Sequence, residues 1–463
     1  MQVRGNPYSL VKSTGFPVDL YPFQQDAVND LAPLPRSALY FDPGCGKTYT
    51  SLAMAQYKLI RSHCDTVLVI VPPVLLINWA RNIGRIPGAT HVVYAGTPVQ
   101  RKRINLNVNY IIVGVQIFKK DFAHITASLC NKAVFGIVDE AQMLKNVTSD
   151  NYKRVSEFFM TNQICLLTGT PMSTPPDTYA LIKLVTPEVY KTFYQWSSIH
   201  IEEVDFFKRP VKYKNLDLLS KNLTLCASRV IKEDVLTDLP EVTLTELTYD
   251  LSPEHLKLYR TLADEQLVKL ESGDKIDLTS TSALWNALSQ VPANAEHFSS
   301  GKINSSVLDL IEQVIDELGG KKLVLFCHYR MTTRRLLERF AEHNPACVYG
   351  ETKDRQAEID RFINNETCRV IVLQLQAGAA GVDGLQDVCC DAMFVELPYM
   401  ASTFRQAVAR LHREGQKLPV NIRVCVAQRT LQKKTWDVVM ERDSLTNLVI
   451  RGPKSIRESI YGE

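Results

Sequence analysis

The chain has 463 residues, of which 45% are apolar and 22% charged, with a formal net charge of +3. This apolar share is ordinary for a folded protein with a sizeable core, so we do not expect a disordered chain. The length predicts two or three domains at roughly 150 residues each. A charge of +3 is too small to identify a nucleic-acid binder, because a phosphate-binding face needs local positive charge.

The eleven cysteines are scattered along the chain, and the only adjacent pair is Cys389 and Cys390. Neither a CxxC pair nor a Cys/His ligand spacing occurs, which favours buried thiols in a reducing compartment over a zinc site. The first 16 residues hold no apolar core of the secretory type, and no run of about 18 apolar residues occurs anywhere. We therefore expect a cytoplasmic protein without a secretion or membrane signal.

In the first half, short apolar and β-branched runs alternate with helical patterns, which is typical of a parallel α/β fold. Each run ends in a polar, Pro or Gly turn, where sites on open α/β sheets lie. Five strand ends are therefore expected to converge on one edge of a sheet. The runs are SALYF at 37–41, TVLVIVPP at 66–73, YIIVGV at 110–115, AVFGIVDEA at 133–141 and QICLLTGTP at 163–171.

The pattern changes from about Tyr194 to Leu239, where the chain reads as mixed, helical and basic. Ser252 is a plausible N-cap for the amphipathic helix that follows it. A second α/β series then comprises KLVLFCHY at 322–329, ACVYG at 346–350, CRVIVLQLQ at 368–376, DAMFVEL at 391–397 and NIRVCVAQ at 421–428. We predict one α/β lobe over 1–195, a helical insertion and connector over 196–245, and a second α/β lobe over 246–463.

The stretch LYFDPGCGKTYT at 39–50 contains the parts of a phosphate loop. Such a loop needs free backbone N–H groups, a lysine for the β and γ phosphates and a hydroxyl for magnesium. Gly44, Gly46, Lys47 and Thr48 supply them between a strand and a helix, whose N-terminus favours an anion. Phe41 stands where the usual pattern begins with glycine. The alternative is a chance GCGKT turn.

Two adjacent carboxylates, Asp139 and Glu140, follow the apolar strand FGIV. Carboxylates are costly to hold at the end of a buried strand, so a role is expected for them. In a nucleotide site the first helps to hold magnesium and the second orients the attacking water. The alternative is a solvated turn.

These motifs and their order resemble those of superfamily-two helicases, and within them the Swi/Snf-type DNA translocases. LYPFQQ resembles the adenine-reading motif and implicates Gln24, and VIVPPVLLINW resembles motif Ia with Trp79. LTGTPMSTPPDTYALIKLVTP resembles motif III, in which Thr168, Gly169 and Thr170 would sense the nucleotide state. DPGCGKT resembles motif I, which often lacks the first glycine and here comprises Pro43, Gly44, Cys45, Gly46, Lys47 and Thr48.

In the second half, VIVLQLQAGAAGVDGLQ resembles motif V, with Gly381 and Asp383 near the nucleotide, and FRQAVARLHREGQ resembles motif VI. The resemblance makes Arg410 and Arg413 arginine fingers and gives Gln406 a coupling role. Their spacing of three predicts neighbouring turns of one helix face. The alternative for the two arginines is a solvated helical face.

Two positions depart from the family pattern. Gln142 stands where motif II commonly has the histidine that couples hydrolysis to nucleic-acid binding, so the strength of coupling is open. Asp383 stands where asparagine is common in motif V, which leaves its role toward DNA open.

The resemblance implies two tandem RecA-like lobes that bind ATP and Mg²⁺ and close around DNA. We expect an ATP-dependent motor on duplex or branched DNA that remodels forks or recombination intermediates, similar to compact phage-type branch-migration helicases. Alternatives are an RNA-stimulated helicase and the motor or DNA-binding subunit of a restriction or repair assembly. The chain is expected to be a monomer in a bacterial or phage-infected cell, with replication or recombination proteins as partners.

Motifs Ia, IV and V normally contact the polymer in this family. Candidate contacts are therefore Trp79, Arg330 and Gln376, and additional charge would come from Lys119, Lys120, Arg334 and Arg335. Each of these basic residues taken alone also fits an ordinary surface charge.

Overall fold

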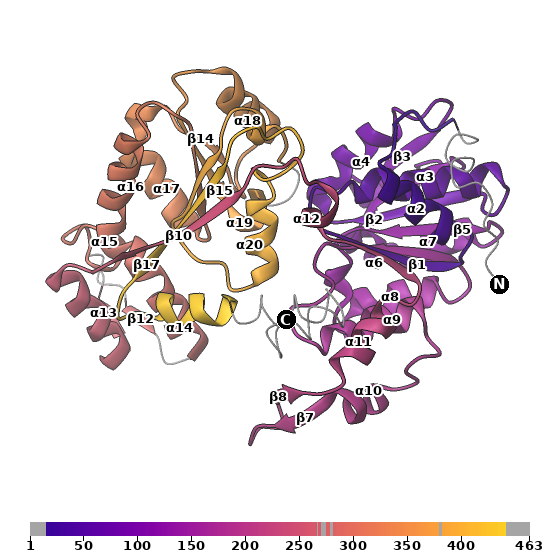
Figure 1. Cartoon of the computed structure of the whole chain (residues 1–463), viewed down its shortest axis with the longest axis horizontal. Helices are drawn as coiled ribbons and strands as arrows, with labels where there is room; N and C mark the ends of the chain where they lie inside the picture. The colour runs from indigo at the N-terminus through magenta and orange to yellow at the C-terminus, as the bar shows by residue number, and fades with distance from the viewer. Residues whose placement is uncertain (1–14, 266, 270–274, 278–280, 379–381, 441–463) are drawn as a thin grey trace. The chain divides into compact units, whose positions relative to one another are not determined.

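The structure is a computed structural model, and it describes residues 15–265, 267–269, 275–277, 281–378 and 382–440 (Figure 1). The described chain forms two compact units that divide between Thr237 and Asp238. Each unit is built on a parallel sheet with helices packed against it (Figure 1). The predicted fold class, two parallel α/β lobes, is confirmed.

The first unit contains a sheet of seven parallel strands in the order β3-β4-β2-β5-β6-β1-β9. Its inner strands are buried on both faces, which is why they read as near-continuous hydrophobic runs. The strands are β1 (Arg36–Phe41), β2 (Thr66–Val71), β3 (His91–Tyr94), β4 (Tyr110–Gly114), β5 (Val134–Val138), β6 (Gln163–Leu167) and β9 (Ala227–Val230).

The helices of the first unit mostly connect successive parallel strands. They are α2 (Pro22–Leu31), α3 (Lys47–Ile60), α4 (Leu76–Ile83), α5 (Pro98–Lys102), α6 (Val115–Lys120), α7 (Phe122–Leu129), α8 (Asp150–Phe158), α9 (Asp177–Val185), α10 (Phe193–His200), α11 (Leu216–Leu223) and α12 (Lys232–Val235). Short 3₁₀ turns lie at η1 (Pro73–Leu75) and η2 (Ala141–Leu144).

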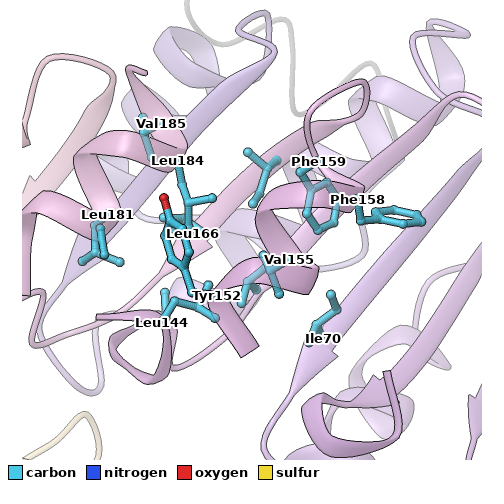
Figure 2. Close-up of a cluster of buried hydrophobic side chains, with 14 of the residues drawn as sticks. Ile70, Leu144, Tyr152, Val155, Phe158, Phe159, Leu166, Leu181, Leu184 and Val185 are labelled. Carbon is cyan, nitrogen blue, oxygen red and sulfur yellow. The ribbon is translucent and has the colours of Figure 1, made fainter. Parts of the chain in front are cut away.

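A large apolar cluster joins α8 and α9 to the sheet of the first unit (Figure 2). Phe158 and Phe159 meet edge to face within it, with ring centroids 4.9 Å apart. A Cβ atom on Gly136 would lie 2.1 Å from the ring of Phe159. Glycine in the middle of β5 therefore lets this ring lie directly against the strand, three residues before Asp139.

The second unit contains a sheet of six parallel strands in the order β10-β17-β16-β13-β15-β14. Its strands are β10 (Val242–Tyr249), β13 (Leu323–Cys327), β14 (Ala346–Val348), β15 (Val370–Gln374), β16 (Asp391–Phe394) and β17 (Val420–Ala427). A separate antiparallel pair consists of β11 (Leu267–Lys269) and β12 (Lys275–Asp277).

The helices of the second unit are α13 (Pro253–Glu265), α14 (Thr281–Gln290), α15 (Ala295–Phe298), α16 (Ser306–Glu317), α17 (Arg330–Arg339), α18 (Arg355–Asn364), α19 (Leu375–Gly378) and α20 (Ala401–Val408), with 3₁₀ turns η3 (Val291–Ala293), η4 (Ala341–His343) and η5 (Leu385–Asp387). Before α13, the hydroxyl of Ser252 accepts a hydrogen bond from the amide of His255 at 3.2 Å. This contact confirms the predicted N-cap.

We predicted a helical insertion and connector over 196–245, but the structure shows that this stretch is not mainly helical. It contains the antiparallel hairpin of β7 (Ile201–Val204) and β8 (Pro210–Tyr213), and also β9, which pairs with β1. The edge strand β10 begins within it and pairs with β17. These strands are short or carry many exposed polar side chains, so they lack the apolar runs on which the prediction relied.

Within the described ranges, no helix has the length and apolar character needed to cross a bilayer.

Candidate functional site

The phosphate-loop candidate lies between the end of β1 at Phe41 and the start of α3 at Lys47. Gly44 and Gly46 have φ angles of 91° and 77°, a left-handed conformation that favours glycine. A Cβ atom on Gly46 would also lie 2.1 Å from the amide nitrogen of Gln24. Both glycines are thus required by the backbone of this turn, which presents the N-terminus of α3.

Phe41 fits the first position of the loop because its side chain and its carbonyl have different surroundings. The ring is fully buried and meets the ring of Phe23 at a centroid distance of 6.0 Å. The carbonyl accepts a hydrogen bond from the Lys47 ammonium at 2.8 Å. Burial lowers the pKa of Lys47, while the carboxylates of Glu140 and Asp139 raise it.

Gln24, predicted to read adenine, lies against the phosphate loop. Its amide nitrogen donates to the Cys45 carbonyl at 3.1 Å, and its amide oxygen accepts from the Tyr21 amide at 3.0 Å. The side chain is buried. Gln24 therefore supports the loop backbone in this structure, and a role toward adenine stays a prediction.

Sequence reasoning did not single out Arg229, which ties β9 to the loop. Its guanidinium donates to the Asp42 carboxylate at 2.6 Å and also to the Tyr40 carbonyl. The backbone amide of Lys232 donates to the second oxygen of Asp42 at 3.0 Å. Arg229 lies in the stretch 196–245, for which we predicted a helical insertion and connector, and the run ASRVI at 227–231 was the available signal of a strand there.

Asp139, the predicted magnesium ligand, is buried at the end of β5. One carboxylate oxygen accepts from the Trp79 indole N–H at 2.9 Å, and the other accepts from the Glu140 amide at 2.8 Å. Burial, followed by the charge of Glu140, raises the pKa of Asp139 to about 6, and the bond from Trp79 opposes this shift.

The prediction that Trp79 contacts nucleic acid is wrong for this structure. Its side chain is 1% exposed on α4, and its one polar atom is bonded to Asp139. A side chain with so little exposed surface cannot contact a polymer in this structure. Instead, Trp79 of motif Ia contacts the Asp139 carboxylate at the carboxyl end of β5, inside the first unit.

Glu140 begins a chain of side-chain contacts that leads to the next strand. It has a φ of 51°, which is uncommon for a residue other than glycine. Its carboxylate accepts from the Gln142 amide at 2.5 Å, and the Gln142 oxygen accepts from the Thr168 hydroxyl at 2.7 Å. The same hydroxyl accepts from the Thr170 amide at 3.0 Å. Gln142 thus links the two carboxyl-end turns directly.

Gly169 lies between these threonines and meets the phosphate loop. A Cβ atom there would be 2.8 Å from Pro43 Cδ and 3.1 Å from the Phe41 carbonyl oxygen. The turn after β6 therefore packs against the turn after β1 with no room for a side chain. The structure therefore brings the predicted phosphate loop, the adjacent carboxylates and the motif III turn together at one group of strand ends.

In the second unit, Asp383 lies beside both predicted arginine fingers. Its carboxylate accepts from Arg413 at 2.5 Å and lies 3.7 Å from the Arg410 guanidinium, which also donates to the Val382 carbonyl at 3.2 Å. The two arginines thus converge on one carboxylate, a group with the charge and oxygen geometry that guanidinium also recognises in phosphate.

The prediction that Arg410 and Arg413 share a helix face is wrong. Helix α20 ends at Val408, and the chain then turns through Gly415, whose φ is 96°. The buried side chain of Gln416 stabilises this turn by donating to the Cys389 carbonyl at 2.9 Å and accepting from two following amides. The turn, and not helical periodicity, brings the arginines together.

Of the two remaining predicted residues of the second lobe, the structure describes only Gln406. Gln406 is half-buried on α20. Gly381 lies outside the described residues, so its role stays a prediction.

Most of the remaining candidates for nucleic-acid contact are exposed. Arg330 begins α17, and its guanidinium lies 3.6 Å from Glu351, which also pairs with Arg334 at 3.0 Å. Gln376 is exposed on α19. Lys120 is exposed, whereas Lys119 and Arg335 are half-buried.

The residues of the first unit fit a nucleoside triphosphate with magnesium. Mg²⁺ is usually held by one or two carboxylates and the substrate phosphates, so Asp139 and the Thr48 hydroxyl make a sufficient protein donor set. Lys47 and the left-handed glycine turn supply the cation and free backbone geometry for the phosphates.

Comparison with known families agrees with this geometry. The family model described as SNF2-related domain matches residues 36–298, which is more than half of the chain, and the helicase conserved C-terminal domain matches residues 306–415. The chain belongs to the SNF2-related family.

Several curated proteins are similar to this SNF2-related chain. An uncharacterized ATP-dependent helicase of Mycoplasma pneumoniae is 23% identical over 91% of the chain and 41% of the relative. The chromodomain-helicase-DNA-binding protein 1-like of Mus musculus is 25% identical over 88% of the chain and 47% of the relative. The SWI/SNF-related regulator of chromatin subfamily A-like protein 1 of Xenopus laevis is 25% identical over 96% and 45%. The chain thus spans about half the length of these relatives.

Among solved structures, the SWI2/SNF2 ATPase core of Sulfolobus solfataricus in complex with dsDNA is 20% identical, with a TM-score of 0.44 over 97% of this chain and 96% of that chain.

Proposed function

We propose that this SNF2-related chain is an ATP-dependent DNA motor that translocates on duplex or branched DNA and remodels forks or recombination intermediates. The observation that carries the proposal is the continuous contact between the phosphate loop, the adjacent carboxylates and the turn after β6. A nucleotide bound to such a group would alter the contacts of several strand ends at once. The group could therefore sense the state of the nucleotide as well as hydrolyse it.

The roles within the first unit follow from chemistry and position. Lys47 would pair with the β and γ phosphates, and the loop amides would cradle them. Thr48 and Asp139 would hold Mg²⁺, which neutralises charge on the phosphates when bound. Glu140 would orient the attacking water, and its contact with Gln142 fixes its carboxylate.

Gln142 would transmit the state of Glu140 to Thr168. A glutamine serves here because its amide donates to the carboxylate while its oxygen accepts from the hydroxyl. Gln142, which stands where motif II commonly has histidine, would therefore have a physical role in linking Glu140 to Thr168. Coupling between hydrolysis and polymer binding then depends on an amide that does not titrate.

The second unit would supply Arg410 and Arg413 to the transferring phosphoryl group. An arginine finger is worth about 10³ to 10⁵ in rate where it has been measured. Both arginines interact with Asp383, so they would exchange this carboxylate for phosphate oxygens. Because the two half-sites belong to different units, hydrolysis would require the units to close, and closure would move the bound polymer.

DNA is proposed as the polymer, held mainly through its phosphates. Arg330 and Gln376 remain candidate contacts, with additional charge from Arg334, Arg335, Lys119 and Lys120. Phosphate contacts position a protein on DNA but carry little sequence information. A motor that moves along any sequence needs contacts of this kind.

Two other functions are distinguished by one experiment. ATP hydrolysis is measured at one salt concentration with duplex DNA, single-stranded DNA, forked DNA and RNA, because phosphate-driven affinity depends steeply on salt. The proposal predicts that duplex or forked DNA stimulates hydrolysis most. Stimulation by RNA alone would favour an RNA helicase, and no hydrolysis by the isolated chain would favour a subunit that needs an assembly.

The same measurement on Lys47→Ala, Glu140→Gln and Arg413→Ala tests the assigned residues. Each variant is expected to lose the stimulated rate, at least about 100-fold, because each removes a separate part of the site. Full ATPase activity in Lys47→Ala would refute the proposed site.

A further inference from the structure

The β7–β8 hairpin presents two exposed aromatic rings at its tip. Phe206 is 95% exposed and Phe207 is 72% exposed, and their ring centroids lie 5.4 Å apart at 86°. Figure 1 shows the hairpin projecting from the body of the first unit beside α10. Exposed side chains of this size are unfavourable in water, so an adjacent pair at a projecting tip indicates a binding function.

The tip is structured by its own backbone. The amide of Asp205 donates to the Arg209 carbonyl at 2.8 Å, and the Lys208 amide donates back to the Asp205 carbonyl at 2.9 Å. The Asp205 carboxylate accepts from the Arg209 amide at 2.7 Å. Lys208 closes the turn with a φ of 60°. These contacts hold the two rings in a defined turn.

The base of the hairpin is anchored in the first unit. The Lys214 amide donates to the His200 carbonyl at 3.0 Å, and Asn215 donates to the Ile199 carbonyl at 2.8 Å. His200 is fully buried, and its ring nitrogen lies 2.6 Å from the Tyr190 hydroxyl. The tip therefore stands on a packed support, as a binding element requires.

Cations accompany the two rings. The Arg209 guanidinium lies 5.5 Å from the centroid of the Phe207 ring, and Lys208 is exposed at the turn. The carboxylate of Asp205, in the same turn, accepts from the Arg209 amide. Aromatic faces beside Lys and Arg are the combination that binds unpaired nucleic acid, by stacking on bases and pairing with phosphates.

We propose that Phe206 and Phe207 form a stacking site for unpaired bases at a DNA junction, with Lys208 and Arg209 contacting the adjacent phosphates. The proposal rests on the proposed function in taking DNA as the polymer. Bases inside a duplex expose no face, so the rings can stack only where the duplex ends or opens. A protein partner is disfavoured, because a stable interface needs about 800 Å² per partner and a two-ring tip offers much less.

The test uses the full chain and forked DNA whose unpaired nucleotides next to the junction are either intact or abasic. Abasic nucleotides keep the phosphates and remove the bases. The wild-type chain is expected to bind the intact fork roughly ten-fold or more tightly than the abasic fork, as measured by fluorescence anisotropy without ATP at one salt concentration.

The double variant Phe206→Ala, Phe207→Ala should bind intact and abasic forks equally. Phe206→Tyr, Phe207→Tyr should retain the preference, because tyrosine keeps the ring faces. Val211→Ala is the matched control, since it removes an exposed apolar side chain from the same hairpin. Lys208→Ala, Arg209→Ala should weaken binding to both forks by the same factor.

Equal binding of intact and abasic forks by the wild-type chain would overturn the proposal. So would an unchanged preference in the double alanine variant, which would leave the rings for a protein partner. Hydrolysis stimulated by blunt duplex should remain in the double alanine variant. Absence of DNA-stimulated hydrolysis in the wild-type chain would refute the proposed motor function. The fork comparison requires no hydrolysis, so it tests the hairpin proposal alone.

Discussion

The indole of Trp79 restrains the carboxylate proposed to hold magnesium. Trp79→Phe keeps the aromatic ring and removes the N–H that donates to Asp139 at 2.9 Å. We expect a fall of about 10- to 100-fold in the rate of ATP hydrolysis or in magnesium affinity, as for other residues that orient a metal ligand. The measurement is the stimulated ATPase rate across a magnesium titration.

Trp196→Phe provides the matched control. Trp196 is equally buried in the first unit, but its indole N–H has no hydrogen-bond partner within the described part of the chain. Its replacement should leave the magnesium titration unchanged. If Trp79→Phe behaves like Trp196→Phe, the indole has no positioning role.

For the residues of the candidate site, the sequence predicted the residue types and their order along the chain better than it predicted their contacts. Lys47, Asp139 and Glu140 were recognisable because their motifs are local in sequence. Trp79 and Arg229 were not assigned their contacts, because their partners lie 60 and 187 positions away. Pairings over such distances are set by the sheet order, which hydrophobic patterns do not specify.

Within the first unit, Gly136 and the ring of Phe159 form one packing element. Gly136→Ala should lower stability by about 1–3 kcal/mol, because the added methyl overlaps the ring. In a Phe159→Leu background the same change should cost much less. The measurement is the thermal midpoint of the four variants. An equal loss in both backgrounds would show that the ring does not set the limit.

In the second unit, Glu396 forms a buried polar element with the N-terminal end of α17 and the two residues before it. Its carboxylate is 2% exposed and accepts from the His328 amide at 2.8 Å, the Tyr329 amide at 2.9 Å and the Thr332 hydroxyl at 2.5 Å. Burial raises its pKa to about 7, although these hydrogen bonds lower it.

A raised carboxyl pKa makes stability depend on pH in a definite direction. Below about pH 4.5 the group is protonated in both states, and between about 4.5 and 7 only the folded state keeps the proton, so stability falls as pH rises. The fall amounts to about 3 kcal/mol. The stability difference between the wild-type chain and Glu396→Gln should decline over this window. A constant difference would contradict the assignment.

The elements that the sequence predicted are those with continuous apolar runs, such as β2 and β15. The short or half-exposed strands β3, β9 and β10 lack that pattern, and the C-terminal end of α20 depends on a local turn. Length and burial, rather than motif content, thus decided which elements could be predicted.

At the scale of the whole molecule, the proposed catalytic groups divide between two units that the motifs had already separated. Lys47 and Glu140 belong to the first unit, and Arg410 and Arg413 to the second. This division was predictable because the motifs follow one another along the chain. From this division we propose that ATP hydrolysis by groups of both units moves the chain along duplex DNA.

Displacement of a third strand from a DNA triplex by the wild-type chain measures this movement, because a translocating protein removes the strand without separating the duplex. We expect displacement that requires ATP and is abolished in Glu140→Gln and Arg413→Ala, while both variants still bind the duplex. Hydrolysis stimulated by DNA without any displacement, or displacement by Arg413→Ala at the wild-type rate, would contradict it.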